Sequence, residues 1–103
     1  MIVTTTAIVE GSPVRQYIGV ATGEVIMAAN IGRDFLASFR DIVGGRSKAY
    51  ETKLKEARDD AFKEMMQQVL QMGGNAVVGV DINYEVVRQG MLMVAVSGTA
   101  VII

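Results

Sequence analysis

The spacing of hydrophobic and polar positions divides the chain into strand-like and helix-like stretches. Residues 2–9 are rich in β-branched side chains and threonine, and strand character resumes over residues 14–27 after a turn that holds the only proline. Gly19 and Gly23 interrupt this second stretch, where they indicate a bulge or the close approach of another backbone. The first quarter of the chain therefore predicts two or three strands.

The period of the pattern changes at Asn30, which is a favourable N-cap residue. Phe35, Phe39 and Ile42 then recur at helical spacing. Gly44-Gly45 follows, and a glycine just past the last turn can adopt the left-handed conformation that ends a helix. This stretch predicts a short helix.

A second and longer helix is predicted over residues 48–72, with Ser47 as its N-cap and Gly73-Gly74-Asn75 as its end. Its apolar stripe repeats every 3.6 residues and is expected to face the core. The stripe consists of Leu54, Ala57, Ala61, Phe62, Met65, Val69 and Met72.

The remaining residues predict a β-hairpin. Residues 76–80 form an apolar strand that continues as a strict alternation, and one face of this alternation is expected to pack on the helices. The alternating apolar positions are Val80, Ile82, Tyr84 and Val86. Gln89-Gly90 is the predicted turn, residues 91–96 are the returning strand, and residues 99–103 are a short apolar tail.

This order of elements predicts one α+β domain that spans residues 1–103. The expected architecture has two layers, with a mainly antiparallel sheet packed on one long and one shorter helix. No stretch resembles a signal peptide and no apolar run is long enough to cross a bilayer, so we expect a cytoplasmic protein without a membrane partner.

Charge and composition exclude several classes of function. The net charge is -1 and the sequence pI is about 5.3, which argues against nucleic-acid binding because that requires a basic surface. Cysteine and histidine are both absent. Their absence excludes disulfides, Cys–His and Ser–His nucleophile pairs, and most zinc and copper sites. We expect no cofactor.

The apolar content is high for so short a chain. Half of the residues are hydrophobic and eleven more are glycine, which exceeds the about 45–50% typical of these residue types together. One interpretation is a core built of valine, alanine and glycine. The other is that apolar surface is buried against further copies of the chain.

Chemically suggestive residues are concentrated between positions 30 and 51. Asp34 and Asp41 share one face of the predicted short helix, and Arg40 lies on the adjacent face. This pattern fits a hard-cation site, an ion-pair network with a partner subunit, or a solvated helix face. The candidate ligand-binding or subunit-interface residues are Asp34, Arg40, Asp41, Gly44, Gly45, Arg46, Ser47, Tyr50 and Glu51.

The segment from Gly44 to Lys48 lacks the spacing of a phosphate-binding loop and follows a helix rather than a strand. One interpretation is a weaker site for a small anion at a helix N-terminus at Ser47, beside two basic side chains. The alternative is a helix–helix corner that is closed by the double glycine.

Taken together, several short motifs resemble the YbjQ-like family of small bacterial and archaeal proteins, and the match covers nearly the full chain. The matching motifs are Gly23-Glu24, Asn30 with Arg40-Asp41, Gly44-Gly45-Arg46-Ser47 with Tyr50-Glu51, Ala57-Arg58, Gly74-Asn75-Ala76-Val77-Val78-Gly79 and Gly98-Thr99-Ala100-Val101. The resemblance implies a dodecin-like subunit that assembles as a homopentameric ring through added short strands. It also implies a label of heavy-metal binding, although soft-metal ligands of the thiolate and imidazole types are absent from this chain.

The leading hypothesis is a non-enzymatic protein that works through its ring-shaped assembly, without catalytic residues. In it, Arg40, Asp41, Arg46, Tyr50 and Glu51 form a charged network near the subunit contact. The rival hypothesis is a module that binds a small anion or a metal ion. An enzyme with carboxylate acid–base chemistry is a third alternative, for which no residue pair shows an activation mechanism.

Overall fold

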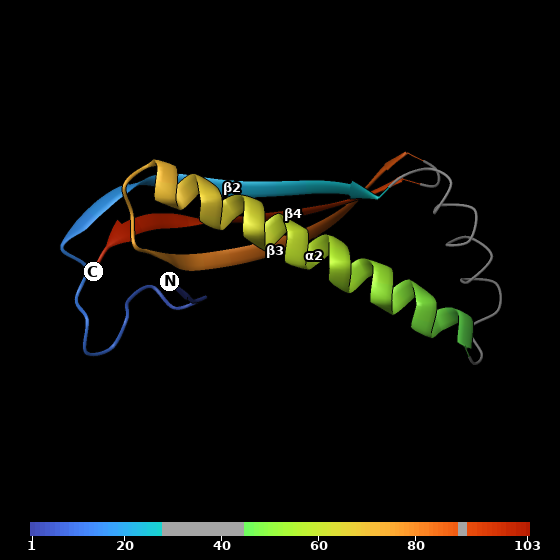
Figure 1. Cartoon of the computed structure of the whole chain (residues 1–103), viewed down its shortest axis with the longest axis horizontal. Coiled ribbons are helices and arrows are strands. Elements are labelled where there is room, and N and C mark those ends of the chain that lie inside the picture. The colour runs from blue at the N-terminus through green and yellow to red at the C-terminus, as the bar shows by residue number, and fades with distance from the viewer. Residues whose placement is uncertain (28–44, 89–90) are drawn as a thin grey trace.

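The computed structural model describes residues 1–27, 45–88 and 91–103. Its elements are β1 (Ile2–Val3), β2 (Gln16–Met27), α2 (Gly45–Gln71), β3 (Ala76–Arg88) and β4 (Met91–Ile102). Figure 1 shows two layers, with the long helix α2 lying across one face of the sheet. The expected α+β class and the long helix are confirmed, whereas the shorter helix predicted after Asn30 lies outside the described residues.

The sheet has the strand order β1-β3-β4-β2. β4 pairs antiparallel with both β2 and β3, and β1 pairs parallel with the start of β3. The helix packs mainly over β2 and β4 and touches β3 little. The strand β3 therefore belongs to the sheet but lies largely outside the area that the helix covers.

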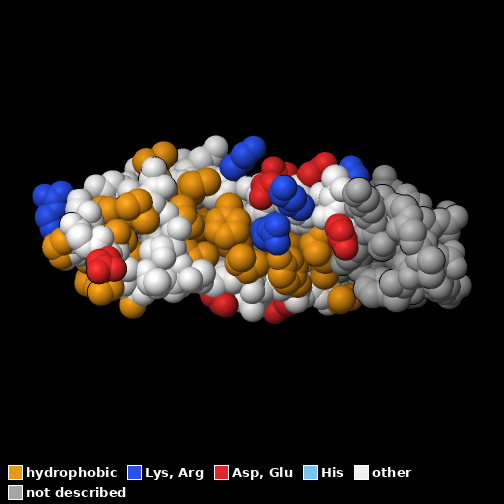
Figure 2. Space-filling model, turned by 90° about the horizontal axis from the view of Figure 1, so that it is seen from below, with side chains coloured by type: hydrophobic (Ala, Val, Ile, Leu, Met, Phe, Trp, Pro, Cys, Tyr) orange, Lys and Arg blue, Asp and Glu red, His pale blue; other side chains and the backbone are white. Residues whose placement is uncertain are grey.

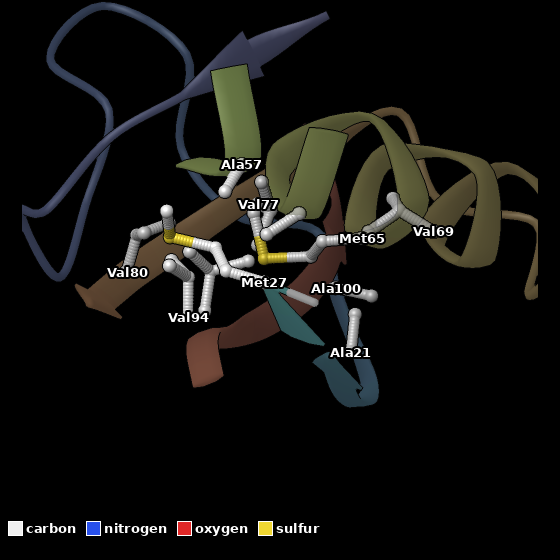
Figure 3. Close-up of a cluster of buried hydrophobic side chains, with 11 residues drawn as sticks. Ala21, Met27, Ala57, Met65, Val69, Val77, Val80, Val94 and Ala100 are labelled. Carbon is white, nitrogen blue, oxygen red and sulfur yellow. The ribbon is translucent and has the colours of Figure 1, made fainter. Parts of the chain in front are cut away.

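The core between helix and sheet is made of small side chains. The predicted stripe is confirmed, because Ala57, Ala61, Met65 and Val69 are buried and the other stripe residues are partly buried. Figure 3 shows these side chains meeting valines and alanines of the sheet. Within residues 1–27, 51–88 and 91–103, every buried hydrophobic side chain is Ala, Val or Met, and no Ile, Leu, Phe or Tyr is buried.

Backbone atoms of the helix and the sheet touch at Gly23 of β2. A Cβ atom at this position would overlap with the carbonyl oxygen of Ala61 and lie 2.9 Å from the amide nitrogen of Met65. The glycine thus allows the backbones of strand and helix to touch. The structure also has a register shift between Tyr17 and Gly19, so both features expected of the two glycines, a bulge and a close approach, are present.

The first strand is shorter than its composition predicts. Only Ile2 and Val3 form β1, and the prediction of a strand to residue 9 is wrong. The physical reason is local hydrogen bonding, in which Thr6 donates its amide N–H to Thr4 Oγ1 (3.2 Å) and its hydroxyl to the carbonyl of Ile8 (2.6 Å). Such side-chain bonds compete with the ladder of a sheet.

Two further boundaries differ from expectation. The long helix begins at Gly45, so Ser47 lies inside it and is not its N-cap. The tail predicted over residues 99–103 is instead the end of β4, which runs without a break through Gly98 to Ile102 as a central strand of the sheet. Gly98 is accommodated because a Cβ there would lie 2.6 Å from Val77 Cγ2, so the glycine has a packing role.

The side chain of Asn75 binds the backbone of Ile103, just beyond the end of β4. Asn75 accepts a hydrogen bond from the amide of Ile103 (2.8 Å) and donates one to its carbonyl oxygen (3.2 Å). The Asn75 amide group therefore presents the donor and acceptor that a strand neighbour would present. Arg15 also donates its guanidinium N–H to the Ile103 carbonyl (3.0 Å).

Candidate functional site

The residues predicted as a site lie at one end of the described chain or outside it. Asp34, Arg40, Asp41 and Gly44 are outside the described residues. The others, Gly45, Arg46, Ser47, Tyr50 and Glu51, lie in the first two turns of α2. Since Glu51 has an exposed side chain and the rest of this group is placed by its backbone alone, their role stays a prediction.

A different candidate emerges at β3, one side of which has no neighbouring strand over much of its length. The strand β1 pairs with Ala76 and Val77, and the following chain adds bonds from Val80 to Thr4 (3.1 Å) and from Gly79 to Thr6 (2.8 Å). From Asp81 to Arg88, no strand among the described residues pairs with this side of β3. Alternate N–H and C=O groups along this stretch are therefore available to another chain.

The side chains next to this free edge are apolar. Ile82, Tyr84 and Val86 continue the face of β3 that begins with the buried Val80, and together these three residues are called the open face of β3. The prediction that the alternating apolar residues pack on the helices is wrong for two of them, because Tyr84 is 44% exposed and Val86 is 72% exposed. The helix α2 makes few contacts with β3.

The same side of the molecule carries a broad apolar band. Figure 2 looks from below, the side on which β3 lies in Figure 1, and shows hydrophobic side chains along the middle of the view between charged groups. Leu54 and Phe62 of α2 are only partly buried against the core. An apolar surface of this kind is typical of a protein interface.

The opposite edge of the sheet is organised differently. At the centre of β2, the amide N–H of Thr22 donates a hydrogen bond to Gln68 Oε1 of the helix at 2.6 Å. Around this bond is a shallow hollow of about 260 Å³, whose lining is polar. It is lined by Thr22, Glu64, Gln67, Gln68 and Gln71. In the described part of the chain, the β2 edge thus carries a helix side chain at Thr22, and the β3 edge beyond Val80 has no pairing strand.

Comparison with known proteins places the chain in a family. Residues 1–103 match the family YbjQ_1, whose description reads "Putative heavy-metal-binding". The chain belongs to this family. It is 61% identical over 101 residues to UPF0145 proteins of Bacillus thuringiensis subsp. konkukian (strain 97-27) and Bacillus cereus (strain ATCC 14579), covering 98% of each chain. The printed names of these relatives state no activity.

A solved structure supports the fold of this YbjQ_1 chain. It is the crystal structure of a protein of unknown function, of the DUF74 family, from Pediococcus pentosaceus ATCC 25745. The two chains superpose with a TM-score of 0.60 at 20% sequence identity, over 100% of this chain and 97% of the other. At this level of identity the likeness establishes a shared fold.

The donor groups do not fit the heavy-metal description of the family. Heavy metals prefer thiolate and imidazole ligands, and the sequence contains neither cysteine nor histidine. Within the described ranges, no three acidic side chains lie close enough to hold a metal ion. Met27 and Met65 are buried among valines and alanines, where their thioethers fill the core.

The described parts of the chain contain no helix long and apolar enough to span a membrane.

Proposed function

We propose that this YbjQ_1 chain is a non-enzymatic subunit of a closed homo-oligomer, and that the assembly is its working form. The observation that carries the proposal is that large apolar side chains lie outside the described core. That core holds only Ala, Val and Met, while Ile26, Leu70 and Tyr84 are each more than 40% exposed. A copy of the same chain would remove such residues from water.

The open face of β3 is the surface proposed to meet a second copy. It combines unpaired backbone groups with apolar side chains, which are the two requirements for adding a strand to a sheet edge. The opposite edge has a different structure, with Gln68 bonded to Thr22. A contact between β3 of one copy and a different surface of the next is head-to-tail, and such contacts form a ring when the rotation between neighbouring subunits closes.

The expected subunit number is five, which the family resemblance implies. In this arrangement the polar and charged residues Arg40, Asp41, Arg46, Tyr50 and Glu51 lie at or near the contact, where oppositely charged groups fix the orientation of the subunits. The proposal assigns these residues to assembly rather than to catalysis.

Native mass spectrometry of the purified protein at micromolar concentration tests the proposal. We expect one species at about five times the 11.1 kDa chain mass, which also reports any small molecule retained by the assembly. A monomer at these concentrations would contradict the proposal.

A pair of variants on β3 tests the surface. Val86→Asp places a charge on the open face and should lower the fraction of oligomer at least tenfold, while the fold is kept because Val86 is 72% exposed. Glu85→Ala, on the other face of the same strand, is the matched control and should assemble as the wild type does. Equal assembly of both variants would show that the open face is not the contact.

A further inference from the structure

We propose that Gln68 closes the edge of β2 to strand addition, so that strand addition in the self-association proposed above takes place at the β3 edge and not at the β2 edge. This inference rests on the proposed function and specifies which edge of the sheet can pair with a second copy. Its basis is that a helix side chain occupies the centre of the β2 edge at Thr22, while no described strand pairs with the β3 edge from Asp81 to Arg88.

The hydrogen bond from Thr22 to Gln68 lies where another strand would pair. Thr22 is in the middle of β2, and its N–H points away from β4 because it reaches the helix side chain at 2.6 Å. By the two-residue period of a strand, the N–H groups of Val20 and Glu24 point in the same direction. A strand added along this edge would need its carbonyl oxygen at the position that Gln68 Oε1 occupies.

The surroundings of this bond also disfavour an added strand. Glu64, Gln67 and Gln71 line the hollow beside Thr22, and Glu24 is exposed on the strand itself. Polar and charged side chains along an edge are a recognised way to prevent edge-to-edge pairing. On β3, Ile82, Tyr84 and Val86 alternate with polar residues, and β2 also exposes Val20 and Ile26, so the difference between the two edges lies in the occupied position at Thr22.

Blocking one edge has a consequence for the size of the assembly. A sheet with two open edges can pair β3 of each copy with β2 of the next without limit, and contacts of this type that do not close produce fibres. With β2 closed at Thr22, the surface that receives the neighbour's β3 must lie elsewhere on the subunit. The Gln68 side chain would thereby favour a finite assembly.

The test compares Gln68→Ala, Gln68→Glu and Gln67→Ala by light scattering over a hundredfold range of protein concentration. Gln68→Ala removes the acceptor, and we expect species larger than the wild-type assembly whose size grows with concentration. Gln68→Glu keeps an oxygen that can accept from Thr22 and should restore the wild-type size. Gln67 lines the same hollow but does not bond to Thr22, so Gln67→Ala should form an assembly of wild-type size.

Amide hydrogen exchange provides a second readout that is independent of assembly. In the monomeric Val86→Asp background, Gln68→Ala should accelerate exchange of the Thr22 amide at least tenfold, and Gln67→Ala should not. If Gln68→Ala forms particles of wild-type size at all concentrations, the edge-closing role is refuted while the proposed oligomer stands. A monomeric wild type refutes the oligomer instead, and the exchange measurement still decides whether Gln68 protects the edge.

Discussion

The contact between Gly23 and the helix gives the sharpest prediction for the stability of the fold. In a Gly23→Ala variant the new Cβ would overlap with the carbonyl oxygen of Ala61 and lie 2.9 Å from the amide nitrogen of Met65. Both neighbours are backbone atoms, which cannot rotate away as a side-chain tip can. Relief requires α2 to move away from β2 by about 1 Å or more, toward the contact distance of about 3.5 Å.

The expected cost follows from what such a displacement disrupts. Overpacking a core typically costs about 1–3 kcal/mol, and we expect about 3 kcal/mol here because the movement also loosens the packing of Met65 and Val69. For a domain of about 100 residues this corresponds to a fall in Tm of roughly 12–24 °C. Urea unfolding followed by circular dichroism measures the loss directly, as a lower midpoint at an unchanged slope.

Gly19→Ala is the matched control, since it adds the same methyl group to the same strand. There the nearest atom is the terminal methyl carbon of Met72, at 3.2 Å and at the end of a flexible side chain, so the change should cost less than about 1 kcal/mol. An unfolding midpoint for Gly23→Ala equal to that of the wild type, or equal to that of Gly19→Ala, would refute the argument that strand and helix touch through their backbones.

Further variants test the hydrogen bonds of Asn75 and the packing at Gly98. Asn75→Ala removes both bonds to Ile103 and should lower the free energy of unfolding by about 1–2 kcal/mol, with Asn75→Asp, which retains the acceptor, falling between; identical urea midpoints would contradict this. Gly98→Ala should destabilise by about 1–3 kcal/mol because its Cβ would lie 2.6 Å from Val77 Cγ2. In a double-mutant cycle Val77→Ala should recover part of that loss, and strictly additive effects would show that the two positions do not interact.

The sequence was sufficient to predict the long helix and the class of fold. The helical period of Ala57, Ala61, Met65 and Val69 is a local signal, and burial follows directly from it. Pairing of distant strands is not a local signal. The apolar run at residues 99–103 fits an edge as well as a centre, and only its pairing with the start of β2 makes it central.

The candidate surface on β3 shows a second limit of sequence patterns. The alternation of Ile82, Tyr84 and Val86 indicates that one face of the strand is apolar, and this is correct. It does not indicate whether the helix extends far enough to cover that face. The hydrogen bond from Thr22 to Gln68 could not be predicted from the sequence either. The two residues are 46 positions apart, and only the crossing of α2 over β2 brings them together.

If the exposed apolar side chains outside the core are covered by neighbouring copies as proposed, dilution should destabilise the fold of this protein. A subunit whose larger apolar groups are shielded only by its neighbours has two sources of stability, and one of them depends on concentration. By mass action, its melting temperature should rise with the amount of protein in the sample. Folding and assembly would then be a single equilibrium, so that the amount of chain a cell makes would set how much of it is folded.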